Sequence, residues 1–185
     1  MKNKWVFSYN SGASAYDEFS QYQDADNLIA PYLQGRYDFS GKIVAEIGCG
    51  SGKFTGKLAR LCKEYYALDK SASMIKLARQ RHGHLPNVRF ITQSAEHLPF
   101  QNAALDILFG SWALTSMGDM DEQRRVMAEI KRTLKQEGLA LLVENHWQSE
   151  FTDMLGMSVD YDKSTIKPLV EEFGFLIEID FMTNI

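Results

Sequence analysis

The sequence predicts an α/β fold, in which a doubly wound, mostly parallel sheet carries helices on both faces. Strand-like and helix-like patterns alternate from about residue 42 onward, which is the order expected for an open parallel sheet. The stretches 105–109 and 139–143 are almost entirely apolar, as strands covered on both faces should be. A glycine-rich turn at 48–52 separates the first strand from the first helix.

The expected elements follow one another along residues 42–143. Strands are predicted at 42–47, 65–68, 88–92, 105–109 and 139–143. Helices are predicted at 53–62, 71–81 and 121–134, because apolar residues recur there at helical spacing. Ser71 is a candidate N-cap of the second helix, and Gly138 is expected to close the third.

Both ends of the chain carry weaker patterns. Aromatic and aliphatic residues between 14 and 33 predict one or two amphipathic helices. Residues 148–161 fit a short helix or a loop that faces a substrate, 164–173 a helix, and 175–182 a sixth strand. No internal repeat or linker interrupts the chain, so we expect a single domain over 1–185.

Composition excludes several classes of partner. The chain has 185 residues, a net charge of -4 and a pI near 5.6, so we expect no nucleic-acid partner and no membrane partner. Basic clusters at 79–82 and 124–132 alternate with apolar residues, which favours exposed helix faces over a nucleic-acid surface. His82 and His84 are expected in a solvated turn.

Cysteine usage and the N-terminal sequence indicate a cytoplasmic protein. Two cysteines, Cys49 and Cys62, do not make a disulfide framework, and no Cys or His spacing suggests a metal site. The first eight residues lack the sustained apolar stretch of a signal peptide or anchor.

The three glycines at 48, 50 and 52 predict a ligand close to the backbone. Glycine allows such an approach, and the helix that follows offers unpaired N–H groups. A dinucleotide and S-adenosylmethionine both meet this description. The dinucleotide fingerprint G-x-G-x-x-G requires a third glycine where Lys53 stands, which disfavours an NAD(P)-dependent oxidoreductase.

Asp69 ends the second strand, 17 residues beyond Gly52. An ionised carboxylate there can accept hydrogen bonds from both hydroxyls of a ribose. The alternative is an N-cap for the helix that starts near Ser71. The glycine turn favours the ribose interpretation.

Five segments, in order, resemble the small-molecule branch, type 11, of class I S-adenosylmethionine-dependent methyltransferases. They are 44–52 (VAEIGCGSG), 68–74 (LDKSASM), 94–100 (SAEHLPF), 105–112 (LDILFGSW) and 129–139 (EIKRTLKQEGL). The resemblance implies a Rossmann-like fold and an enzyme that takes S-adenosylmethionine as methyl donor and releases S-adenosylhomocysteine. The acceptor would be an unidentified small molecule.

The resemblance also assigns roles to residues and segments. It implies a helical lid at 1–40, a cofactor-binding core at 41–147, and an acceptor-side segment with the last strand at 148–185. The residues expected to bind the donor are Tyr16, Glu46, Gly48, Cys49, Gly50, Gly52, Asp69, Lys70, Met74, Ser94, Ala95, Glu96, Gly110 and Ser111. Trp112, Trp147, Phe151 and Met154 are expected to line an apolar acceptor pocket.

The sequence departs from the family pattern at three places. Ser94 replaces the usual Asp, so a hydroxyl or a backbone group would contact the adenine amino group. Gln136-Glu137-Gly138 replaces the common Pro-Gly-Gly turn. The usual seventh strand has no candidate after the sixth. Either the last strand pairs differently, a second copy completes the edge and gives a homodimer, or the chain is trimmed.

Methyl transfer from a sulfonium needs positioning more than a nucleophilic side chain, because the donor is already activated. The turn at 110–113 lacks carboxylates, which disfavours a metal-assisted reaction. His146 follows the fifth strand and is the candidate general base; a loop histidine without a role is the alternative, and His97 and Glu144 are further candidates. A non-catalytic protein that binds S-adenosyl ligands is the second hypothesis for the function.

Overall fold

The computed structural model of the chain describes residues 17–18, 24, 27–114, 116–117, 119–144 and 169–175. Its centre is a five-stranded, parallel sheet with strand order β3-β2-β1-β4-β5. The strands are β1 (Ile43–Ile47), β2 (Glu64–Asp69), β3 (Val88–Thr92), β4 (Leu105–Ser111) and β5 (Leu134–Val143). The helices are α3 (Ile29–Arg36), α4 (Thr55–Leu58), the 3₁₀-helix η1 (Ala59–Leu61), α5 (Ala72–His82) and α6 (Met120–Thr133). The predicted fold class is confirmed.

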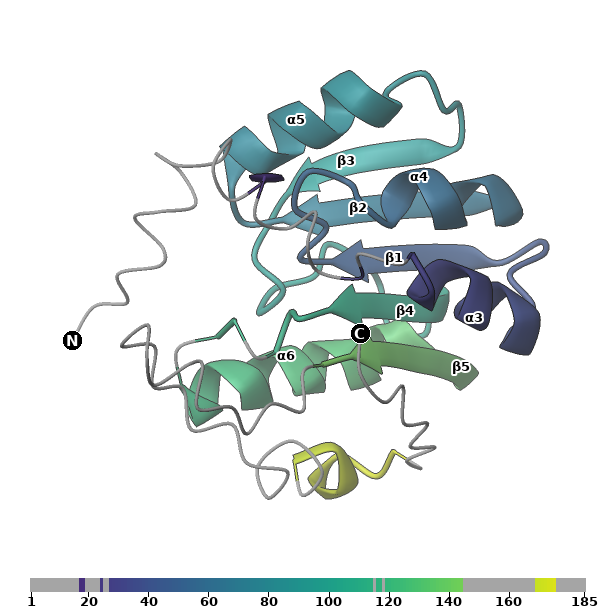
Figure 1. Cartoon of the computed structure of the whole chain (residues 1–185). Coiled ribbons are helices and arrows are strands. Elements are labelled where there is room, and N and C mark those ends of the chain that lie inside the picture. The colour runs from purple at the N-terminus through teal and green to yellow at the C-terminus, as the bar shows by residue number, and fades with distance from the viewer. Residues whose placement is uncertain are drawn as a thin grey trace.

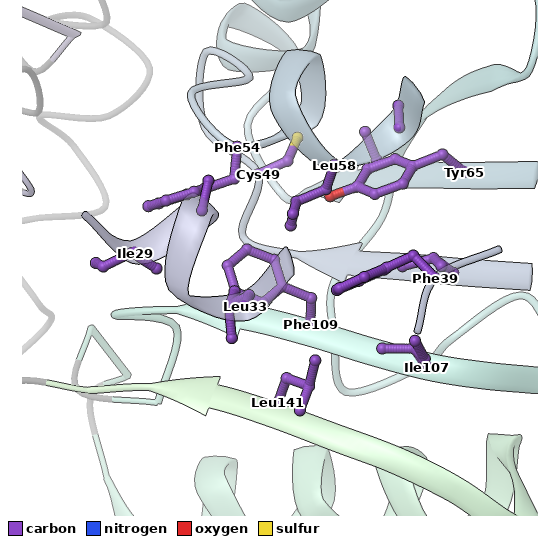
Figure 2. Close-up of a cluster of buried hydrophobic side chains, with 14 of the residues drawn as sticks. Ile29, Leu33, Phe39, Cys49, Phe54, Leu58, Tyr65, Ile107, Phe109 and Leu141 are labelled. Atoms are coloured by element: carbon purple, nitrogen blue, oxygen red, sulfur yellow. The ribbon is translucent and has the colours of Figure 1, made fainter. Parts of the chain in front are cut away.

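Helices cover both faces of the sheet (Figure 1). On one face, α3 and α4 pack over a cluster that includes Phe54, Leu58 and Phe109 (Figure 2). On the other face, Val126, Met127 and Ile130 of α6 pack against inward residues of β1 and β4. Because β4 is sandwiched between these layers, its apolar run is buried along most of its length.

Side-chain caps fix the beginnings of the two long helices. Ser71 accepts a hydrogen bond from the backbone N–H of Met74 at 3.3 Å, so the predicted N-cap of α5 is confirmed. Asp119 accepts from the N–H of Glu122 at 2.7 Å and caps α6 in the same way. α6 also has acidic residues in its first turn and basic residues in its last, which complements the helix dipole.

Two boundaries differ from the prediction. The helix predicted at 53–62 is shorter, because α4 tightens into η1 after Leu58. The expectation that Gly138 closes the long helix is wrong: α6 ends at Thr133 and β5 begins directly at Leu134. Residues 135–138 form an irregularity in the pairing with β4, where a Cβ on Gly138 would lie 3.0 Å from the carbonyl oxygen of Lys135. Gly138 therefore serves a tight bend inside the strand region.

The structure describes only part of the two chain ends, for which the sequence gives weaker predictions. Residues 169–172 are helical, within the helix predicted at 164–173. The sixth strand, the segment 148–161 and most of the predicted N-terminal lid lie outside the described residues, as does any seventh strand. Over the ranges described, no helix combines the length and apolarity needed to cross a bilayer.

Candidate functional site

The loops that follow the strands converge at the carboxyl edge of the sheet, next to β1. β1 lies between β2 and β4, so the chain connections on its two sides run in opposite directions along the sheet. Open α/β sheets bind ligands at such a reversal, outside the carboxyl ends of the strands. The segment 48–54, here called the glycine loop, leaves β1 at this point and leads into α4.

All three glycines of the loop adopt backbone angles that other residues rarely take. Their φ angles are +65° at Gly48, +54° at Gly50 and +89° at Gly52. A Cβ on Gly52 would lie 2.7 Å from Cδ2 of His82, and one on Gly48 would lie 3.5 Å from Cβ of Ala113. Within the part of the chain that the structure describes, a Cβ on Gly50 would meet no atom within 4 Å. Gly52 therefore serves packing against α5, whereas Gly50 faces open space that a ligand can enter.

His82 is part of this packing, so its expected place in a solvated turn is wrong. Its ring lies against the backbone of Gly52 and Gly56, where an added Cβ would come within 2.7 Å or less of ring atoms. Burial lowers the pKa of the imidazole. A neutral ring therefore fills the space between α5 and the glycine loop.

Asp69 holds the glycine loop and the start of α5 at the same time. Its Oδ2 accepts from the N–H of Gly50 at 2.9 Å, and its Oδ1 accepts from the N–H of Ser71 at 2.8 Å. Burial raises the pKa of this carboxyl. Each carboxylate oxygen can accept a second hydrogen bond, as the ribose interpretation requires. The N-cap interpretation of Asp69 is wrong, because Ser71 is itself the N-cap residue of α5.

Glu46 lies beneath the loop and is 1% exposed. Its Oε2 accepts from the hydroxyl of Thr55 at 2.5 Å and from the hydroxyl of Tyr65 at 2.9 Å. Burial raises the pKa of Glu46 to about 7. Since Thr55 begins α4 and Tyr65 lies on β2, Glu46 links β1 to the start of α4, directly after the loop, and to the neighbouring strand.

We expect Glu46→Gln to raise stability at pH 8. The pKa of Glu46 is about 7 in the folded chain against an ordinary value of 4.5, so its contribution to stability is complete below pH 4.5 and is lost as the pH rises through 7. Glutamine keeps an acceptor oxygen for Thr55 and Tyr65 but does not ionise. The variant should therefore exceed the wild type by up to about 3 kcal/mol at pH 8.

Urea unfolding of both proteins at pH 5 and pH 8 measures this difference. The gap in unfolding free energy should widen from pH 5 to pH 8. A gap that stays constant between the two pH values would show that Glu46 does not titrate in this range.

The loop after β3 is stabilised by its own side chains. The Ser94 hydroxyl accepts from the N–H of Glu96 at 3.2 Å, and the Glu96 carboxylate pairs with Arg125 of α6 at 2.6 Å. Lys70, after β2, pairs with Glu122 of α6 at 3.6 Å. Met74 is fully buried, while Ala95 is partly buried against the core. Ser94, Glu96 and Lys70, which were predicted to bind the donor, thus already contact another group of the protein.

The turn after β4 contains a strained aromatic residue. Trp112 has a φ of +52°, which is rare for a bulky side chain. Its N–H donates to the carbonyl of Val143 at 2.7 Å, and its ring centroid lies 6.3 Å from that of Phe54. Strain of this kind persists where the surroundings fix it, commonly at functional sites.

Gly110 and Ser111, which precede Trp112 at the end of β4, and Glu144, which follows β5, have structural contacts. A Cβ on Gly110 would lie 3.1 Å from Cγ1 of Ile47 and 3.3 Å from Cδ2 of Leu142, so a larger side chain would require these neighbours to move. Ser111 pairs with Val143 of β5. Glu144, a further candidate base, accepts from the N–H of Leu114 at 2.9 Å and holds the turn in place.

Several predicted residues lie outside the described part of the chain: Tyr16, His146, Trp147, Phe151 and Met154. Cys49 is buried, its N–H donates to the carbonyl of Leu68 at 2.9 Å, and burial raises its pKa well above the ordinary value. Sequence reasoning missed Asp17 and Arg81, which contact Ser51 in the glycine loop. No motif or spacing links these three positions.

Two cavities among the described residues lie away from the glycine loop. One, of about 430 Å³, lies between α5 and the end of β3. The other, of about 120 Å³, is lined by Lys42, Asp106 and Lys135, near the amino end of the sheet. Among the residues described, no three His, Cys, Asp or Glu side chains are arranged to hold a metal ion. The site is therefore identified from the geometry of the loops.

Comparison with known proteins identifies the family of the region that contains these loops. A family model described as a methyltransferase domain, type 11, matches residues 45–142. Phosphoethanolamine N-methyltransferase 1 of Arabidopsis thaliana is 35% identical over 97 residues, 51% of this chain and 18% of that protein. The chain spans 18–27% of the length of the first three curated relatives it matches.

Solved structures agree on the fold. A SAM-dependent methyltransferase from Aquifex aeolicus superposes with a TM-score of 0.67 at 17% identity, over 89% of this chain and 87% of that one. Phosphoethanolamine N-methyltransferase 1 of Haemonchus contortus, in complex with phosphoethanolamine and S-adenosylhomocysteine, gives 0.60 at 22% identity, over 82% of this chain and 29% of that one.

Proposed function

We propose that this chain, which belongs to the type 11 family of methyltransferase domains, is an enzyme that transfers a methyl group from S-adenosylmethionine to a small-molecule acceptor. The transfer is an in-line displacement that uses no metal ion. The open space over Gly50, next to the Asp69 carboxylate, is the observation that carries this proposal.

The residues of the loop fit the donor. A backbone with φ of +54° and no neighbour within 4 Å of a Cβ at Gly50 leaves room for a ligand against the main chain. Asp69 would hold the ribose, since each of its oxygens has one acceptor position left. Glu46 fixes the loop from below through Thr55. When bound, the sulfonium of the donor supplies an activated methyl group.

The remaining residues position the acceptor. Trp112, held in its strained conformation against Phe54, forms an apolar wall at the turn after β4. Such a wall orients the acceptor and excludes water, which is the main requirement of a displacement at an activated centre. His146, which the structure does not describe, remains the proposed base for an acceptor that must lose a proton. The acceptor is a small molecule, and the phosphoethanolamine in the names of two relatives is one to assay.

We also propose the partners, the location and the oligomeric state of the enzyme. The three arginines of α6 are paired with carboxylates, as in Arg125–Glu96 and Arg132–Glu129, which fits a helix without a nucleic-acid partner. We likewise propose that the enzyme has no membrane partner. We place the enzyme in the cytoplasm and consider a homodimer through a sheet edge.

We expect S-adenosylmethionine and S-adenosylhomocysteine to raise the melting temperature of the protein, and NAD and NADH to leave it unchanged. A saturating ligand stabilises the folded state by an amount set by its concentration relative to its Kd, about 2.7 kcal/mol at a hundredfold excess. A thermal-shift screen measures the binding. Formation of S-adenosylhomocysteine with a panel of acceptors, including phosphoethanolamine, measures turnover.

The screen separates the alternatives. Donor binding without turnover on any acceptor of the panel would favour a non-catalytic binding protein. Stabilisation by NADH and not by either S-adenosyl compound would favour an oxidoreductase and would overturn the proposal.

A further inference from the structure

An ion pair joins the N-terminal segment to the glycine loop and to α5. Asp17 is 8% exposed. Nη1 of Arg81, near the end of α5, donates to Oδ1 of Asp17 at 2.7 Å, and its Nη2 donates to Oδ2 of the same carboxylate. The two-pronged geometry is the strongest arrangement for a guanidinium and a carboxylate.

Ser51 connects this ion pair to the loop. Its hydroxyl donates to Oδ1 of Asp17 and accepts from Nη1 of Arg81 at 2.9 Å. Ser51 is 6% exposed and stands between Gly50 and Gly52. A buried hydroxyl with both a donor and an acceptor partner cannot rotate without leaving one of them unpaired.

The loop is therefore held by carboxylates at two adjacent residues. Asp69 fixes the N–H of Gly50, and Asp17 fixes the side chain of Ser51. Glycines on both sides of Ser51 give this segment more backbone freedom than other residues would. The contacts of Ser51 are 30 and 34 residues distant in sequence, so they restrain the loop independently of β1 and α4.

We infer that Asp17 and Arg81 are positioning residues that set the conformation of the glycine loop through Ser51, so that the affinity for the methyl donor depends on this ion pair. The inference rests on the proposed function for its ligand. The Arg81 guanidinium lowers the pKa of Asp17, and the carboxylate therefore stays ionised at neutral pH.

The first test measures donor affinity. Asp17→Asn and Arg81→Gln should each weaken S-adenosylhomocysteine binding about tenfold by calorimetry, the effect of one partly exposed charged hydrogen bond. The double variant should be no worse than about tenfold, because both changes remove the same interaction. Arg81→Lys keeps the charge but not the fork, and should lose about threefold.

Kinetics separates positioning from a catalytic role. In these variants the KM for the donor should rise, while kcat at saturating donor stays within about twofold of wild type. Lys135→Gln is the matched control, because it breaks a 2.7 Å ion pair with Asp106 at the opposite end of the sheet. That variant should bind the donor as wild type does.

The second test needs no ligand. Amide hydrogen exchange at residues 50–53 should be faster in Asp17→Asn and Arg81→Gln than in wild type, and unchanged in Lys135→Gln. If the wild type binds neither S-adenosyl compound, the proposed function fails and exchange alone decides the inference. Unchanged loop exchange, unchanged affinity in both single variants, or losses that multiply to about a hundredfold in the double variant would each overturn it.

Discussion

Asp69→Ala is expected to weaken donor binding strongly and to loosen the glycine loop. The substitution removes the acceptors of the Gly50 and Ser71 N–H groups, at 2.9 and 2.8 Å, together with the two oxygens proposed to hold the ribose. Hydrogen bonds to a charged group contribute about 1.5–3 kcal/mol each. Loss of two ribose contacts thus predicts a fall in affinity of at least about a hundredfold, measured by calorimetry with S-adenosylhomocysteine.

Asp106→Ala provides the control for Asp69. Asp106 accepts from the backbone N–H of Ile43 at 2.8 Å and pairs with Lys135. Like Asp69, it is therefore a carboxylate with two hydrogen-bond partners. It lies at the amino end of the sheet. Its removal should lower stability and leave donor affinity unchanged. Equal affinity of Asp69→Ala and wild type would exclude Asp69 from the donor site.

Gly50→Ala and Gly52→Ala are expected to fail in different ways. A methyl group on Gly50 meets no atom of the described residues within 4 Å, so its cost in stability is the strain of a left-handed backbone, about 1–2 kcal/mol. The methyl would occupy the space proposed for the donor, and affinity should fall at least about thirtyfold, the equivalent of 2 kcal/mol. Calorimetry and urea unfolding of the same variant measure both effects.

Gly52→Ala should lose more stability than Gly50→Ala. Its Cβ would lie 2.7 Å from Cδ2 of His82, so overpacking of about 1–3 kcal/mol adds to the backbone strain. His82→Ala in the same chain should recover the overpacking part, since it removes the ring that the new methyl meets. If Gly50→Ala and Gly52→Ala lost the same stability, the packing role of Gly52 would be wrong.

The fold could be predicted from the sequence because it depends on local patterns. The apolar run of β4 and the helical spacing of α5 and α6 can be recognised within each short segment, and the five strands predicted within residues 42–143 are present. The junction between α6 and β5 could not be predicted from a local pattern. Gly138 was a reasonable helix stop, but its bend is set by pairing with β4, which lies about 30 residues earlier in the sequence.

The candidate site shows the same difference between local sequence patterns and contacts of distant residues. Gly50 and Asp69 can be proposed from the sequence as donor-binding residues, because the glycine spacing and the strand end predict them together. The reason for Gly52 could not be inferred, because it depends on the ring of His82, 30 residues later. The contact of Asp17 with Arg81 joins positions 64 residues apart, and nothing in the local sequence of either residue indicates it.

Cys49 places a sulfur nucleophile inside the loop that we propose binds an alkylating cofactor. A thiolate there would compete with the acceptor for the methyl group, and the enzyme would inactivate itself by S-methylation. The thiolate is the reactive form of cysteine, and burial raises the pKa of Cys49 well above its ordinary value. Seclusion of this one side chain keeps the thiol protonated, so the loop can carry a cysteine and still present the methyl group only to the acceptor.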